Sequence, residues 1–137
     1  AGCAPIVDAW EKGNEFAELW EKAHTVAAGI RVPVAVGDFL ILNVVRESGG
    51  TAIAIDDETI IQFRDALAKD EGFLLCPEGA ATLAAYHECL KKGLVDKNEK
   101  AVLFNCASGI KYPLPPVYDR LDIEGEPIDY SRFIDGI

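Results

Sequence analysis

The feature that most constrains this chain is an alternation of short apolar runs with segments of helical periodicity. The apolar runs cover Thr51–Ile55, Phe73–Cys76 and Val102–Phe104, and helical patterns fill residues 57–71 and 80–92 between them. Strands that are separated by helices of this length normally lie parallel, with right-handed connections between them. We therefore predict an α/β fold, in which a parallel sheet with right-handed βαβ crossovers forms the centre of three αβα layers.

Residues with known helix-end preferences fix the predicted ends of these helices. Asp56 or Asp57 is expected to cap the first one, whose initial turn is acidic as the helix dipole favours. Gly72 ends that helix, and Gly93 follows the next one as its C′ residue.

The first 50 residues are predicted to be mainly helical. A helix begins at Pro5 and stops at Gly13, and an apolar face in residues 16–20 suggests a further helical turn. Residues 24–33 have no clear periodicity and are expected to form a loop with at most one helical turn. Residues 37–48 are apolar nearly all round, so we predict a deeply buried helix there.

The length and the composition indicate one domain. The chain has 137 residues, of which half are hydrophobic, enough for a single core of ordinary size. We expect residues 1–113 to form this domain and residues 114–137 to be an acidic, proline-led tail that wraps the surface. The opening residues Gly2–Pro5 resemble the middle of a structure, so we expect the chain to be a piece of a longer protein.

The net charge of −10 is spread along the chain, which makes nucleic acid a poor candidate partner and a small molecule a better one. No apolar segment approaches the roughly 20 residues of a membrane span, and no signal peptide is recognisable. We therefore predict a cytoplasmic protein that does not bind membranes.

Four cysteines are widely separated and include no C-x-x-C pair. We favour reduced, buried thiols over a disulfide or a zinc site, since the sequence is typical of a cytosolic protein. These cysteines are Cys3, Cys76, Cys89 and Cys106.

Candidate functional groups follow two of the predicted strands. Asn105, Cys106 and Ser108 come after the third apolar run, and Glu78 opens the helix after the second run. The carboxyl ends of strands are where α/β sheets hold ligands. Motifs for dinucleotide binding, phosphoryl transfer and zinc or serine hydrolysis are absent, and His87 lies in the middle of a helix, so we assign it no role. The remaining groups suit a ligand that carries its own chemistry.

Six blocks of this sequence, in the same order, resemble those of the threonine synthases. That family belongs to the fold type II pyridoxal-phosphate enzymes, whose large domain has an αβα architecture. The blocks are Gly2–Ile6, His24–Pro33, Gly37–Leu42, Arg46–Gly50, Cys76–Thr82 and Leu103–Pro113.

The resemblance implies a cofactor, a reaction and a set of site residues. Pyridoxal 5'-phosphate acts as an electron sink while O-phospho-L-homoserine and water become L-threonine and phosphate. Gly29, Glu78 and Cys106 match cofactor-binding positions, and Cys106 stands near the pyridine nitrogen where relatives usually carry threonine or serine. Arg31 and Thr25 are the expected substrate contacts, and no metal ligand is expected.

The resemblance also implies that catalytic parts lie elsewhere. In the family, the Schiff-base lysine and the loop that holds the cofactor phosphate precede the first block, and Lys111 matches only a structural position. We therefore expect the C-terminal part of a threonine synthase, with no catalytic residue of its own. It would be inactive without the N-terminal portion and prone to self-association. The alternative is a non-catalytic α/β module that binds a small ligand or a partner.

Overall fold

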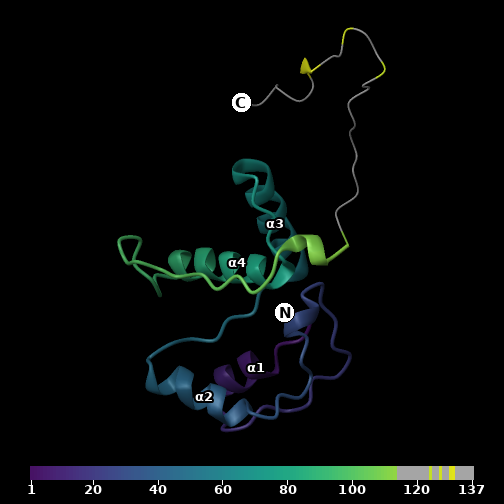
Figure 1. Ribbon diagram of the computed structural model, residues 1–137. Coiled ribbons are helices and arrows are strands. Elements are labelled where there is room, and N and C mark those ends of the chain that lie inside the picture. Colours follow the sequence, from purple (N-terminus) through teal and green to yellow (C-terminus); the bar gives the residue numbers. More distant parts are fainter. Residues whose placement is uncertain (114–123, 125–126, 128–129, 132–137) are drawn as a thin grey trace.

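The structure, a computed structural model, describes residues 1–113, 124, 127, 130 and 131. Two helix pairs form its body: α1 packs on α2, and α3 packs on α4 (Figure 1). The 3-10 helix η1 lies against α4. The predicted C-terminal tail falls almost entirely outside the described residues. The elements, in chain order, are α1 (Pro5–Lys12), η1 (Ala28–Ile30), α2 (Asp38–Glu47), α3 (Asp57–Glu71), α4 (Pro77–Lys91) and η2 (Gly109–Lys111).

The predicted parallel sheet is wrong. Over the described part of the chain there is no strand, and the only β pairing is a single antiparallel bridge between Leu75 and Ser108. Two backbone hydrogen bonds flank this bridge, from the Cys76 amide to the Ala107 carbonyl (3.2 Å) and from the Gly109 amide to the Leu74 carbonyl (3.0 Å). The three-layer αβα architecture is therefore absent from the described residues.

The sheet is missing because the three apolar runs do not become neighbours with paired backbones. Val102, in the last run, is 95% exposed, although we predicted a buried strand there. That run passes alongside α4, where the Thr82 hydroxyl donates to the Phe104 carbonyl at 3.4 Å (Figure 1). An apolar run signals a preference for burial, but a strand forms only where another strand supplies its backbone partners.

The helices themselves begin and end close to the predicted residues. Pro5 opens α1, and Asp56 caps α3 by accepting a 2.8 Å hydrogen bond from the Thr59 amide. Gly13, Gly72 and Gly93 follow three of the helices with positive φ values, as C′ glycines do. These ends are set by local chemistry, which explains why the sequence predicted them.

Two expectations for the first 50 residues are wrong. Residues 14–20 contain no helical turn, and the Ala17 amide in this segment instead donates to the Asp38 carboxylate at 2.7 Å. Helix α2 forms, but of its apolar side chains only Leu42 is buried, while Leu40 and Val44 are exposed. Helix α2 is apolar nearly all round, so α1 covers only part of its apolar surface.

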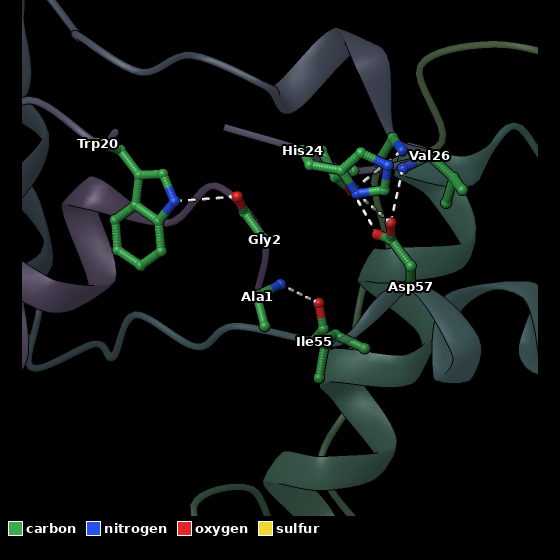
Figure 2. A network of polar contacts seen from close by, with 9 residues as sticks. Ala1, Gly2, Trp20, His24, Val26, Ile55 and Asp57 are labelled. Atoms are coloured by element: carbon green, nitrogen blue, oxygen red, sulfur yellow. Dashed lines mark hydrogen bonds and ion pairs between the residues drawn. The ribbon is translucent and has the colours of Figure 1, made fainter. Parts of the chain in front are cut away.

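Polar contacts tie the N-terminal residues to α3 (Figure 2). Asp57 accepts from the Val26 amide at 3.0 Å, and His24 lies beside the same carboxylate with Nδ1 at 3.8 Å. The terminal amine of Ala1 donates to the Ile55 carbonyl, and the Trp20 indole donates to the Gly2 carbonyl at 2.9 Å. These contacts place residues 24–30 over the core. The buried core cluster consists of Ala27, Ile60, Leu75 and Ala80.

Candidate functional site

The candidate site lies at the first turn of α4, where the chain is most completely buried. Residues 75–80 are all buried. Cys76 is the N-cap residue, and its sulfur accepts a 3.3 Å hydrogen bond from the Gly79 amide. Pro77 follows at the first helical position, where an N–H is not needed. The local sequence therefore starts a helix and places Glu78 within its first turn.

Glu78 is the centre of this site. Its Oε1 accepts two hydrogen bonds, one from the Gly29 amide (2.6 Å) and one from the Tyr112 hydroxyl (2.7 Å). Its Oε2 is buried and has no hydrogen-bond partner. Glu78 thus links α4 to η1 and to the residue that follows η2, and one carboxylate oxygen is left available to a ligand.

The carboxyl group of Glu78 is held in its ionised form. Burial alone would raise its pKa, but hydrogen bonds from the Tyr112 hydroxyl and from backbone amides, including that of Gly29, outweigh burial and lower the pKa. The same carboxylate raises the pKa of Tyr112 to about 12. At neutral pH, the tyrosine is therefore a hydrogen-bond donor to a charged acceptor.

Two thiols lie beside this carboxylate. The sulfur atoms of Cys76 and Cys106 are 3.8 Å apart, and the Cys76 sulfur is 3.7 Å from Oδ1 of Asn105. Burial raises the pKa of the Cys76 thiol, which is inaccessible, whereas Cys106 is exposed. All four cysteines are free, as predicted, but only Cys76 is fully buried.

Glycines allow the close packing around these groups. A Cβ at Gly29 would stand 2.9 Å from Glu78 Oε1, and one at Gly79 would stand 2.4 Å from Asn105 Oδ1. At Gly109, a Cβ would stand 2.5 Å from the Leu75 carbonyl oxygen. Real Cβ atoms do not approach this closely, so the absence of side chains at these positions permits the site.

The structure brings the three predicted cofactor residues together. Gly29 donates to Glu78, and the thiol of Cys106 lies within 4.8 Å of the Glu78 carboxylate. We did not predict roles for Cys76 and Tyr112. The position of Cys76 before Pro77 was a usable signal for the N-cap, but no local pattern links Tyr112 to a carboxylate 34 residues earlier.

The two predicted substrate residues do not join this cluster. The Thr25 hydroxyl donates to the Asp57 carboxylate at 2.5 Å and accepts from the Ala27 amide at 3.2 Å, so it anchors the loop to α3. Arg31 is exposed at the end of η1. Thr25 and Gly29 do line a largely apolar cavity of about 580 Å³, which also borders α1, α2, α3 and α4.

His87 is exposed on α4, where its ring contacts that of Phe63 at a tilt of 55° with centroids 4.9 Å apart. None of the helices among the described residues is long and apolar enough to cross a membrane.

Comparisons with known proteins give a consistent result. Residues 1–107 match the family model of the pyridoxal-phosphate dependent enzymes. A threonine synthase of Methanocaldococcus jannaschii is 31% identical over 112 residues, which are 82% of this chain and 28% of that protein. A threonine synthase of Methanosarcina acetivorans is 32% identical over 136 residues, 99% of this chain and 33% of that protein. The chain therefore spans about a third of the length of these curated relatives, and the resemblance predicted from the sequence is confirmed.

Proposed function

Because this chain belongs to the pyridoxal-phosphate dependent enzymes, we propose that it is the C-terminal part of a threonine synthase. The family's cofactor is pyridoxal phosphate, as we predicted. The complete enzyme would convert O-phospho-L-homoserine and water to L-threonine and phosphate. The observation that carries this proposal is the buried Glu78 carboxylate, placed between Gly29 and the two thiols with one oxygen unpartnered.

Residues 75–80, which we call the head of α4, fit such a cofactor. Glu78 Oε2 is a buried acceptor that lacks a donor, and a polar group of a bound ligand would satisfy it. Gly29 and Gly79 leave no room for side chains between the packed segments. Cys106 is exposed beside them and accessible to a ligand. A polar aromatic ring can lie between such groups, which offer it a hydrogen-bond acceptor, a thiol and closely packed backbone.

Each residue would have a distinct role toward the cofactor. Cys106 would lie near the pyridine nitrogen, and its neutral thiol would not transfer a proton to that nitrogen as an aspartic acid would. Glu78 would remain charged, because Tyr112 and Gly29 hold its other oxygen. When bound, pyridoxal phosphate supplies an electron sink for negative charge that develops on the substrate.

For the substrate, we propose Arg31 as the contact to the phosphate group. Its side chain is exposed, and a guanidinium binds phosphate through two parallel hydrogen bonds. The hydroxyl hydrogen of Thr25 is already donated to Asp57, so we do not retain Thr25 as a substrate contact.

We further propose that this chain works only together with the N-terminal portion of the enzyme. That portion would supply the cofactor-binding lysine and the loop for the cofactor phosphate. The exposed apolar side chains of Val102 and Phe104 support a partner segment, since such residues favour burial. Cytoplasmic location and self-association of the isolated chain remain predictions from the sequence.

The first experiment tests the isolated chain. The chain is mixed with pyridoxal phosphate and reduced with borohydride, and each lysine is examined by mass spectrometry. We expect no lysine to be modified stoichiometrically, and no release of phosphate from O-phospho-L-homoserine. Stoichiometric modification of one lysine would show that the proposed division of the enzyme is wrong.

The second experiment tests Cys106 in the protein encoded by the complete reading frame. Cys106→Ser should retain threonine formation, because a hydroxyl occupies the same space and is a stronger hydrogen-bond partner. Cys106→Asp should change the ratio of threonine to side products, because a carboxylic acid favours a protonated ring nitrogen. Cys89→Asp, in the second half of α4, is the control and should leave the ratio unchanged. An unchanged ratio in Cys106→Asp would exclude Cys106 from the cofactor site.

A further inference from the structure

An apolar cavity of about 580 Å³ lies between the helix pairs α1–α2 and α3–α4, whose arrangement Figure 1 shows. Protein interiors are close-packed and contain few voids larger than a water molecule, so a hollow of this size is unusual for a finished core. Every helix of the two pairs contributes to its walls. Its lining includes Pro5 of α1, Ile41 of α2, Ile60 of α3, and Ala81 and Ala85 of α4.

The lining offers little to water or to a polar ligand. Of the described residues that line the cavity, none is charged, and the hydroxyl of Thr25 already donates to Asp57. Water in a cavity needs two or more polar partners, and small-molecule sites combine apolar walls with polar groups that orient the ligand. A dry cavity of about 150 Å³ holds one benzene, so this one has room for roughly three or four apolar side chains.

The mouth of the cavity is apolar as well. Val36, which lines it, is 94% exposed, and three other lining residues, Ile30, Val32 and Ile41, are also exposed. Exposed apolar side chains that surround a hollow mark a surface for another chain segment. We call the cavity and these four side chains together the apolar recess.

We propose that the apolar recess binds an apolar segment of the N-terminal portion of the enzyme, which inserts aliphatic or aromatic side chains into the cavity. This inference rests on the proposed function, because the threonine synthase assignment supplies the partner. The chain corresponds to 28% and 33% of the two relatives, so about two thirds of such an enzyme is available to provide the segment.

A second copy of this chain is a poorer partner for the apolar recess. In a two-fold contact the same surface faces itself, so one hollow would lie against another and both would stay unfilled. Each copy also carries a net charge of −10, which opposes their close approach.

The apolar recess adjoins the candidate site through η1. Gly29 lines the cavity, and its amide donates to the Glu78 carboxylate at 2.6 Å. A segment seated in the cavity therefore packs against the turn that holds Glu78. The docking uses neither the thiol of Cys106 nor the free oxygen of Glu78, which stay available to the cofactor.

Photo-crosslinking in the protein encoded by the complete reading frame tests this proposal. Val36 is replaced by photo-leucine, an aliphatic residue that carries a diazirine, and the linked peptides are identified by mass spectrometry after irradiation. We expect position 36 to be linked to a peptide that precedes Ala1. Photo-leucine at Val44, which is exposed on α2 but does not line the cavity, is the matched control and should lose the links to that peptide.

A second variant fills the cavity. Ala85→Trp should leave the thermal midpoint of the isolated chain unchanged or higher, because the indole occupies empty space. It should lower the midpoint of the complete protein by about 5 °C or more, because it displaces the docked segment. Ala66→Trp, at an exposed position of α3, is the control and should shift neither midpoint by more than about 2 °C.

The outcomes separate this inference from the proposed function, since threonine formation is measured on the same samples. The docking is overturned, even with threonine formation intact, if position 36 is linked only within residues 1–137 or to a second copy. It is also overturned if Ala85→Trp leaves the complete protein as stable as Ala66→Trp does. Links to the preceding peptide without threonine formation would overturn the proposed function alone. A reading frame that encodes nothing before Ala1 would overturn both.

Discussion

The head of α4 and the segment 102–104 contrast sharply, although we predicted a strand ending at Cys76 in the one and a buried strand in the other. Around Glu78, residues 75–80 are buried without exception, and the segment docks on η1 and η2 through hydrogen bonds. In the second segment, Val102 and Phe104 remain 95% and 77% exposed. Apolar character alone therefore did not decide which of the two segments is covered.

The difference lies in where each segment finds its partners. The head of α4 has local and distant partners: Cys76 caps the helix and Pro77 takes the first helical position, while Glu78 accepts hydrogen bonds from residues far along the chain. The segment 102–104 would need a neighbouring strand for its backbone and a packed layer for its side chains. We infer that local signals fix where α4 begins, whereas the burial of either segment depends on distant partners that the local sequence does not identify.

The largest expected effect comes from breaking the packing behind the head of α4. Gly109→Ala would put a Cβ 2.5 Å from the Leu75 carbonyl oxygen and 2.6 Å from Leu74 Cγ. Backbone must move to relieve this contact, so we expect a loss of about 3 kcal/mol in the free energy of unfolding, measured by urea denaturation. Gly37→Ala is the control, because its nearest neighbour would be 3.9 Å away, and its cost should stay below about 1 kcal/mol. Equal costs for both variants would contradict the packing described here.

The second prediction removes the central acceptor. Glu78→Ala should cost about 2 kcal/mol at pH 7, since hydrogen bonds to a charged group are lost from Gly29 and Tyr112. Because the folded state lowers the pKa of Glu78, its contribution is present above the usual glutamate pKa of about 4.3 and is lost as the pH falls through the folded value. Urea denaturation across acidic pH should therefore show the two stabilities converging.

Glu88→Ala provides the matched control for that variant. Glu88 pairs with Lys92 at 3.5 Å on the exposed side of α4, and such pairs contribute about 0.5 kcal/mol or less. A loss in Glu88→Ala as large as that in Glu78→Ala would mean that helix charge, rather than the buried contacts, explains the effect.

The third prediction concerns Tyr112 and alkaline pH. Tyr112→Phe removes the hydroxyl that donates to Glu78, which should cost about 1 kcal/mol at pH 7. The pKa of Tyr112 is raised to about 12, so its contribution is fully present below the usual tyrosine pKa of about 10 and is lost as the pH rises toward 12. Unfolding measured between these pH values should show the gap between wild type and Tyr112→Phe closing. A constant gap would contradict the hydrogen bond.

The helices could be predicted from the sequence because their end signals are local. Pro5, Asp56 and Gly72 act on neighbouring residues. Pro5 and Gly72 were predicted correctly, and Asp56 is one of the two caps that the sequence left open. The sheet could not be predicted reliably from Thr51–Ile55 and Val102–Phe104, since their apolar residues do not state which segment will pair with them. The prediction that α2 is deeply buried was wrong for the same reason, since its apolar residues do not show which segment covers them.

The candidate site was predicted in part, and the limits are again physical. The family resemblance identified Gly29, Glu78 and Cys106, which the structure brings together. It did not reveal Tyr112, because a hydrogen bond between side chains 34 residues apart depends on how distant segments of the chain fold together. Nor did it show that Thr25 is bound to Asp57, since either residue alone reads as an ordinary polar side chain.

The smallest expected effect tests the exposed side of the comparison. A buried phenylalanine that is truncated costs about 3–5 kcal/mol, whereas an exposed one costs within about 0.5 kcal/mol. With Phe104 77% exposed, Phe104→Ser should fall in the second class when urea denaturation is measured on dilute chain. Leu42→Ala, at a side chain that is 0% exposed, is the positive control and should cost at least about 2 kcal/mol.

If Phe104→Ser costs more as the protein concentration rises, copies of the chain cover this residue, as the predicted self-association requires. A cost above about 2 kcal/mol that is independent of concentration would mean that the chain buries Phe104 itself, and the contrast with the head of α4 would disappear.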